Sequence, residues 1–179
     1  EITTRLVGSE MCIRDSTTTP RDLENDLDVW IIQIALAESV AARLRKHGFK
    51  CKTVEITVRD NGLYSFSRQI HLRQPTNITN EIVTAAFQLF KDNYKWEHPI
   101  RSLGIRAADL VLDDIPVQLD LFGNQEKKEK LEKLDRTVDE IRRRFGYFSI
   151  QRAAMYQDKV LSHLDAGTHT IHPHSYFHR

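Results

Sequence analysis

Two alternating stretches joined by a turn sequence constrain the fold of this chain more than any other feature. Apolar and polar side chains alternate from Lys52 to Arg59, and the alternation returns from Tyr64 to Arg73. Between them, Asp60-Asn61-Gly62 is typical of a hairpin turn, because Asn and Gly tolerate positive φ. A period of two residues buries one face of a strand and leaves the other polar. The sequence therefore predicts an antiparallel β-hairpin with one apolar side.

Helical periodicity flanks this hairpin on both sides. Apolar residues recur at helical spacing from Leu27 to His47 and again from Thr79 to Tyr94. A last alternating stretch runs from Ile100 to Leu112, and Thr17–Thr19 is a candidate for a short leading strand. This order predicts an α+β fold in which a four-stranded antiparallel sheet carries both helices on one face.

The other face of the predicted sheet is expected to be open and polar. Hydroxyl and guanidinium groups at two-residue spacing suit contacts with phosphate oxygens, which carry no base information. A solvated sheet face has the same residue types, and from this pattern alone it is the commoner outcome. Arg101 shares the parity of the apolar set, which predicts a strand end or a bulge there. The expected lining is Thr53, Thr57, Arg59, Ser65, Ser67, Arg73, Ser102 and Arg106. Glu55 also lies on this face, where its negative charge is unfavourable to phosphate.

A short amphipathic peptide, Gln118-Leu119-Asp120-Leu121-Phe122, follows the last predicted strand. Leu121 and Phe122 offer apolar area to a partner's pocket, and the amide of Gln118 offers donors and an acceptor. The same side chains could instead pack on their own domain. Beyond the peptide, apolar residues at near-heptad spacing from Gln125 to Arg144 predict an amphipathic helix. Packing of this helix on the main lobe is the commoner case, and a partner helix is the alternative.

Composition and charge exclude several classes of protein. The chain has 179 residues, 40% of them hydrophobic and 28% charged, as in ordinary globular proteins. The net charge of +1 means that any footprint for nucleic acid must be local. No apolar run reaches the length of a membrane span, so we expect no membrane partner. Cys12 and Cys51 lie far apart, which fits a reducing, cytoplasmic location.

The sequence contains no constellation that predicts catalysis or a metal site. Asp109, Asp113 and Asp114 lie near a strand end, but two-metal phosphoryl transfer needs carboxylates that converge from separate elements. We find neither a Gly-rich phosphate loop nor a nucleophile paired with a base. The histidines near the C-terminus lack carboxylate or cysteine support and are expected to lie in a flexible tail: His163, His169, His172, His174 and His178.

These patterns divide the chain into five segments. Residues 1–16 show no sustained period and are interpreted as a non-native or artefactual segment. Residues 17–113 form the predicted sheet domain, and residues 114–124 form a linker that contains the amphipathic peptide. Residues 125–157 form a helical extension, and residues 158–179 form the flexible tail.

Several segments resemble, in order, the little-finger domain of Y-family translesion DNA polymerases. The peptide Gln118–Phe122 resembles the motif with which bacterial polymerases and repair proteins bind the sliding clamp. Together with Ile141–Gly146, it is similar to the C-terminus of the UmuC-like branch (ImpB/MucB/SamB, DNA polymerase IV-like) from Gram-positive bacteria. The little-finger segments are Thr17–Asp22, Val40–Gly48, Val54–Asp60, Ser65–Gln69 and Ile100–Arg106.

This resemblance implies two kinds of binding site. The sheet would hold a template–primer duplex by phosphate contacts that do not depend on base sequence. By position, the likeliest of these contacts come from Arg101, Ser102 and Arg106. A second group comprises Thr18, Ser65, Ser67 and Arg68. The residues for the clamp pocket are Gln118, Leu119, Leu121 and Phe122, with Asp120 as a spacer.

The resemblance also implies a division of labour in the whole protein. Catalytic carboxylates of the family, and the Mg²⁺ that they bind, belong to palm, fingers and thumb domains that precede the little finger. We therefore expect a C-terminal fragment without cofactor or polymerase activity of its own. Its parent would be a DNA-directed DNA polymerase that acts on damaged DNA in repair, in the bacterial cytoplasm at the nucleoid. The alternative is a free-standing module that joins a repair complex without binding DNA.

Overall fold

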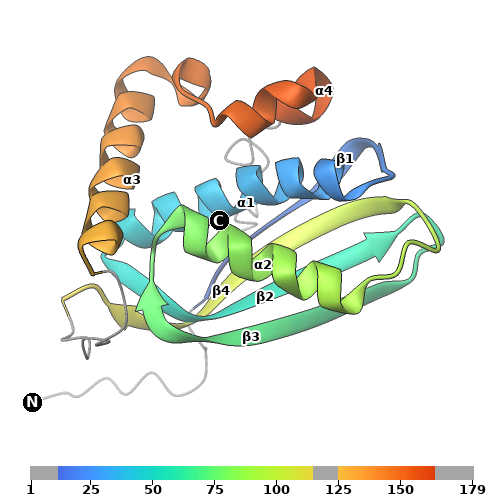
Figure 1. Ribbon diagram of the computed structural model, residues 1–179, viewed down its shortest axis with the longest axis horizontal. Coiled ribbons are helices and arrows are strands. Elements are labelled where there is room, and N and C mark those ends of the chain that lie inside the picture. The colour runs from blue at the N-terminus through green and yellow to red at the C-terminus, as the bar shows by residue number, and fades with distance from the viewer. Residues whose placement is uncertain (1–11, 115–124, 164–179) are drawn as a thin grey trace, which may run out of the picture.

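A four-stranded antiparallel sheet forms the centre of the computed structural model, which describes residues 12–114 and 125–163. The strands are β1 (Ile13–Leu23), β2 (Phe49–Asp60), β3 (Ser65–Thr76) and β4 (Ile100–Leu112), in the order β1-β4-β2-β3. Helices α1 (Asp26–Lys46) and α2 (Thr79–Asn93) cover the same face of the sheet (Figure 1). The predicted α+β architecture is therefore confirmed, with strands that extend a few residues beyond the predicted hairpin.

The alternation in the sequence places the core between the sheet and the two helices. Val54, Ile56 and Val58 of β2 are at most 1% exposed, and they pair across the sheet with the buried side of β4. β3 is an edge strand, so its apolar side is less well covered, and Ile70 is 39% exposed. Burial of the central strands on one side leaves their alternate residues on an open face.

Helix α1 is buried on more sides than a single apolar stripe predicts. Asn25 caps its first turn by accepting a hydrogen bond from the backbone N–H of Asp28 at 2.9 Å. Its buried residues run almost without interruption from Val29 to Ala37, as expected of a helix covered on two sides. The sheet covers one side, α2 packs alongside, and helix α4 (Lys159–Ser162) lies over α1 on the side away from the sheet (Figure 1).

Strand β1 begins earlier than the predicted Thr17–Thr19 strand. Ile13 pairs with Ala107 of β4, and the pairing continues without interruption to Thr18 and Ser102. Residues 13–16 therefore belong to the sheet, although their lack of a sustained period predicted a segment set apart from the domain. The non-native origin proposed for residues 1–16 stays a prediction.

A bulge lies at Arg101, one of the two outcomes that its parity allows. Arg59 of β2 pairs with Ser102, but the next residue, Asp60, pairs with Ile100. Arg101 is thus the extra residue, and Ile100 returns to the core with no exposed surface. The hydroxyl of Thr19 donates to the carbonyl of Arg101 at 3.1 Å, which ties β1 to the bulge.

The chain beyond the sheet folds back on the lobe. Helix α3 (Gln125–Phe145) is followed by short 3-10 turns at Tyr147–Ser149 and Ala153–Gln157 and by helix α4 (Lys159–Ser162). The predicted flexible tail does not begin at residue 158. Asp158 caps α4 and accepts a hydrogen bond from the guanidinium of Arg21 in β1 at 2.6 Å. Leu161 of α4 is fully buried in the core. No helix in the described ranges is long and apolar enough to cross a membrane.

Candidate nucleic-acid interface

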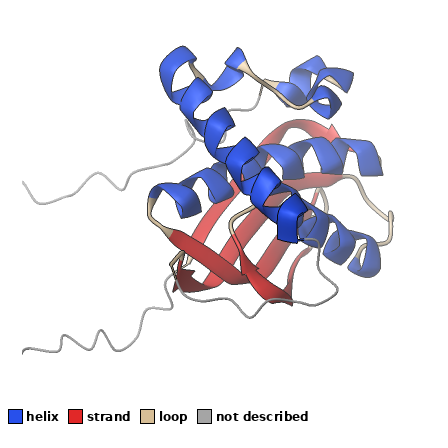
Figure 2. Cartoon of the chain, turned by 60° about the vertical axis from the view of Figure 1, so that its left-hand side comes forward, coloured by secondary structure: helices blue, strands red, loops and turns tan. Residues whose placement is uncertain are grey.

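The open face of the sheet presents polar side chains in rows that cross all four strands. The backbone register fixes each row, because residues paired across antiparallel strands point to the same side of the sheet. In the described part of the chain, the helices lie on the opposite side of the sheet (Figure 2). From β1 through β4 and β2 to β3, the rows are Thr18–Ser102–Arg59–Ser65, Ser16–Gly104–Thr57–Ser67 and Arg14–Arg106–Glu55–Gln69.

The arginines on this face differ in how far their charge is already neutralised. Arg106 pairs with Glu55 at 3.1 Å, and Arg101 at the bulge pairs with Asp22 at 3.4 Å. Arg14 and Arg59 are exposed and form no ion pair with any other described residue. The last two guanidinium groups are therefore the most available to an anionic ligand.

The middle row contains a glycine where the other rows contain side chains. A Cβ atom at Gly104 would lie 3.2 Å from the Cβ of Ser16 and 3.6 Å from the Cβ of Thr57. The hydroxyl of Thr57 is in turn 3.2 Å from the hydroxyl of Ser67. Gly104 is itself buried, so the absence of a side chain there lets Ser16 of β1 and Thr57 of β2 pack close to the backbone of β4.

Most of the DNA-contact residues predicted from the resemblance come together on the open face. Thr18, Ser65, Ser67, Ser102 and Arg106 lie in its rows, and Arg101 lies at the bulge beside them.

Arg68 lies on the other side of the sheet. It pairs with the buried Ile56 and donates to the side chain of Asn93 in α2 at 3.2 Å.

Two other residues of the predicted open lining also differ from the expected arrangement. Thr53 is buried, its hydroxyl donates to Asp109, and it lies 3.0 Å from Nδ1 of His71. Arg73 follows a shift of register in β3 and borders a groove formed with residues of α2 and α3.

Arg14 and Ser16 were missed because residues 1–16 showed no sustained period. Polar residues at two-residue spacing, Arg14, Ser16 and Thr18, extend the alternation of the predicted leading strand toward the N-terminus. This alternation could have placed Arg14 and Ser16 on the open face.

The acidic residues near the end of β4 do not fit a Mg²⁺ ion. Asp109 has a positive φ of 52° and accepts from Thr53, whereas Asp113 pairs with Lys50 and Arg136, each at 2.8 Å. Across residues 12–114 and 125–163, no group of three or more His, Cys, Asp or Glu side chains could hold a metal ion. These carboxylates serve the fold, by tying β4 to β2 and α3.

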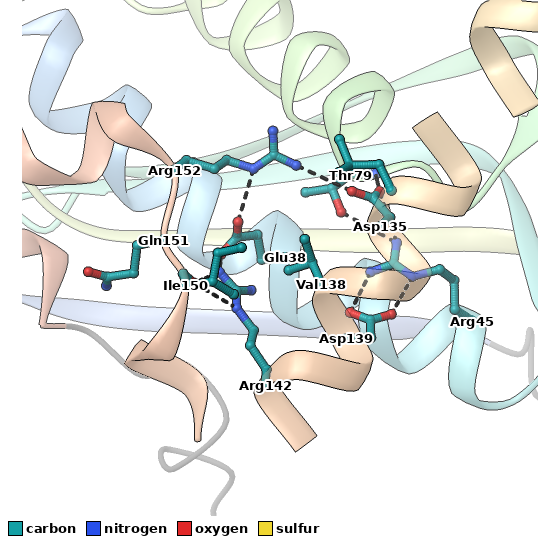
Figure 3. A pocket seen from close by; sticks show the side chains of 11 residues that line it. Glu38, Arg45, Thr79, Asp135, Val138, Asp139, Arg142, Ile150, Gln151 and Arg152 are labelled. Atoms are coloured by element: carbon teal, nitrogen blue, oxygen red, sulfur yellow. Dashed lines mark hydrogen bonds and ion pairs between the residues drawn. The ribbon is translucent and has the colours of Figure 1, made fainter. Parts of the chain in front are cut away.

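A buried ion-pair network fastens α3 and the following turn to the lobe (Figure 3). Arg45 of α1 contacts Asp139 at 2.6 Å and Asp135 at 3.2 Å. Glu38 of α1 accepts from both Arg142 and Arg152 at 2.9 Å. Arg45, Glu38 and Asp135 are each less than a tenth exposed, so each charge depends on its partners for compensation.

Asp135 also supplies a cap that helix α2 lacks locally. The residue before α2 is Ile78, which has no polar side chain to accept from the first turn. Oδ2 of Asp135 accepts from the backbone N–H of Thr79 at 2.8 Å, and the negative charge suits a helix N-terminus. Docking of α3 therefore also supplies the N-terminal cap of α2, a helix of the sheet domain. The heptad pattern did not indicate this contact, because it directs attention to apolar residues such as Leu134 and Phe145, and these two are largely exposed.

The fold and the open face define an α+β domain suited to phosphate contacts. Residues 12–121 match the family described as impB/mucB/samB family C-terminal domain. The chain belongs to this family, and its sheet domain is the C-terminal domain of a Y-family DNA polymerase.

Relatives with known names agree with this assignment. The chain is 43% identical over 152 residues to DNA polymerase IV of Acetivibrio thermocellus, covering 85% of this chain and 38% of the relative. It is 33% identical over 157 residues to DNA polymerase IV 2 of Bacillus subtilis, covering 86% of this chain and 37% of the relative. The chain thus spans less than two fifths of the length of these relatives.

Among solved structures, this chain is similar to one described as a complex of beta-clamp processivity factor and little finger domain of PolIV. It aligns with a TM-score of 0.48 and 14% identity, over 63% of this chain and 100% of that chain.

Proposed function

We propose that this chain is the part of a translesion DNA polymerase that holds the template–primer duplex and ties the enzyme to the sliding clamp. The duplex lies on the open face, and the clamp binds Gln118–Phe122, which lies outside the described residues. The observation that carries the proposal is the set of hydroxyl and arginine rows on that face, with Arg14 and Arg59 unpaired among the described residues. Membership of the family supports it.

The chemistry of the open face suits a polymerase that must grip any sequence. Guanidinium and hydroxyl groups contact phosphate oxygens, and these contacts fix position without reading bases. No deep pocket is required, because the duplex backbone is itself the ligand. Arg101 and Arg106, predicted as the leading contacts, can contribute by exchanging Asp22 or Glu55 for a phosphate. Arg14 and Arg59 need no such exchange.

Catalysis is proposed for the parent protein alone. The relatives are DNA polymerases more than twice as long as the aligned region, and the carboxylates described in this chain do not fit Mg²⁺. We propose that the catalytic carboxylates and Mg²⁺ belong to other domains of a bacterial enzyme that works at the nucleoid in DNA repair. This chain alone then binds DNA without extending a primer.

The test is salt-dependent binding of the chain to a labelled blunt duplex. Arg14→Ala and Arg59→Ala should each weaken binding several-fold and reduce the slope of log K against log salt by roughly 0.9 per lost phosphate contact. Arg68→Ala is the matched control, since it removes an exposed arginine of the neighbouring strand from the opposite side of the sheet. Equal losses for Arg59→Ala and Arg68→Ala would contradict an interface on the open face.

Clamp binding is tested separately with a purified bacterial sliding clamp. Leu121→Ala/Phe122→Ala should abolish binding, because it removes the apolar side chains proposed for the pocket. Asp120→Ala is the control and should bind normally, since this residue is proposed as a spacer. Clamp binding without salt-dependent DNA binding would instead favour the free-standing interaction module.

A further inference from the structure

A second basic surface lies in a groove between α1 and α3. The groove has a volume of about 640 Å³, and its lining includes the aromatic ring of Tyr147. Its position is set by the buried ion pairs that dock α3, so the groove exists only when the extension is folded back. The basic residues that line it are Arg43, Arg45, Lys46, Arg136, Arg142 and Arg143, and the acidic ones are Glu38, Asp139 and Glu140.

The acidic residues in the less exposed part of the groove are paired with arginines, whereas exposed basic residues of the groove remain without an acidic partner among the described residues. Glu38 is neutralised by Arg142, and Asp139 is neutralised by Arg45. Lys46 and Arg143 are exposed and form no ion pair with other described residues. Glu140 is the only exposed acidic residue in the lining, so the accessible part of the groove is basic.

The groove reaches the β1 edge of the sheet at Arg43, which is part of its lining. Arg43 of α1 donates to the backbone carbonyl of Arg14 at 2.8 Å and pairs with Asp15 at 3.2 Å. Arg14 belongs to the outer row of the open face, on the edge strand of the sheet. Basic side chains therefore follow one another from Arg106 and Arg14, around the β1 edge at Arg43, to Lys46 and Arg143.

Aromatic rings at the groove and beside it distinguish between possible polyanions. Tyr147 lines the groove, and Phe148 lies beside it with its ring centroid 5.2 Å from that of Tyr147. Phe148 stacks on His163 at 5.4 Å and is still 43% exposed. Unpaired bases stack on exposed aromatic rings, whereas the bases of a duplex already stack on each other. Basic groups beside aromatic rings thus favour a single strand.

We propose that the α1–α3 groove binds single-stranded DNA that continues from the duplex on the open face. Lys46 and Arg143 contact its phosphates, and a base stacks on Phe148. This site extends the proposed function, on which it rests, because the path into the groove begins at the β1 edge of the duplex-binding face.

The test compares two DNA ligands of equal duplex length, one blunt and one with a single-stranded 5′ overhang, on the whole chain. Lys46→Ala/Arg143→Ala should weaken binding of the overhang ligand several-fold and reduce its salt slope by roughly 1.4, for two lost contacts with a single strand. Binding of the blunt ligand should be unchanged. The control is Lys133→Ala/Lys159→Ala, which removes the same charge from exposed positions outside the groove.

Three results would overturn the site. One is equal loss in the groove variant and the control, which would indicate a general charge effect. Another is equal loss with both ligands, which would place the groove within the duplex interface. The third is an intact chain that binds both ligands equally. Failure of the duplex-binding face looks different: the blunt ligand would not bind, while the overhang ligand would still bind and still respond to Lys46→Ala/Arg143→Ala.

Discussion

Arg45 of α1 and Asp139 of α3 form a two-point ion pair, with Nε–Oδ2 at 2.6 Å and Nη2–Oδ1 at 2.9 Å. Arg45 also contacts Asp135, and the side chains of Arg45 and Asp135 are each 7% exposed. We expect Arg45→Met to lower the free energy of unfolding by about 3–5 kcal/mol, because it leaves buried carboxylate charge without its partner. Urea denaturation followed by circular dichroism measures this loss.

The neighbouring residue provides the control. Lys46 is exposed and forms no ion pair with other described residues, so Lys46→Met should change the free energy of unfolding by less than about 0.5 kcal/mol. Similar losses in both variants would mean that the Arg45 network does not stabilise the docked extension.

A side chain at Gly104 should hinder binding of DNA to the open face. Gly104 is buried, so a valine there would have to displace Ser16 and Thr57, whose Cβ atoms lie 3.2 and 3.6 Å from the added Cβ. Gly104→Val is best made together with Ser16→Gly, which removes the nearest clash. The double variant should fold, as judged by circular dichroism, and should bind blunt duplex several-fold more weakly than Ser16→Gly alone. Equal binding by these two proteins would show that the centre of the face is not contacted.

Docking of α4 should depend on pH through Asp158. The pKa of Asp158 is lowered from its ordinary value, first by the hydrogen bond from Arg21 and then by the backbone N–H of Leu161. A carboxyl group with a lowered folded-state pKa stabilises the fold above its unfolded pKa of about 4, and this stability is lost as the pH falls through the folded-state pKa.

The comparison is with Asp158→Asn, which keeps a good capping residue for α4 but cannot carry the charge. The difference in thermal stability between the original chain and this variant should be largest near neutral pH and should shrink at acid pH below about 4. A difference that stays constant, or grows on acidification, would contradict a role for the charged form.

The cysteines should differ sharply in reactivity. Burial raises the pKa of the Cys51 thiol to about 12, and the residue has no exposed surface, whereas Cys12 is partly exposed. Because the thiolate is the reactive form, a thiol reagent at pH 8 should label the native chain at Cys12 alone. Cys51 should react only in denaturant. Rapid labelling of a Cys12→Ser variant under native conditions would show that the core around β2 opens readily.

Local periodicity was enough to predict the sheet and the helices that cover it. Val54, Ile56 and Val58 alternate with polar residues because one side of β2 meets α1 and α2, and the same parity rule restricted Arg101 to a strand end or a bulge. Parity also placed Arg68 beside apolar residues, as the structure does, whereas its predicted DNA contact came from family resemblance.

Contacts between distant charges could not be predicted in this way. Arg45 and Asp139 are 94 residues apart, and on its own helix each looks like an ordinary solvated residue. The pattern of α3 drew attention to Leu134 and Phe145, which remain exposed, and gave no weight to Asp135, which is buried. Such pairs become apparent only once the chain is folded, because complementary charge has no sequence period.

The adjacency of β1 and β4 has a mechanical consequence. The strands run antiparallel, so Ile13, where β1 begins, lies at the end of the ladder from which β4 continues toward Leu112. Their hydrogen bonds run across the strands, so a force that pulls these two ends apart loads one bond pair at a time. A force that separates Ile13 from the end of β4 would therefore break the β1–β4 hydrogen bonds one pair after another, at a far lower force than shearing the sheet would need.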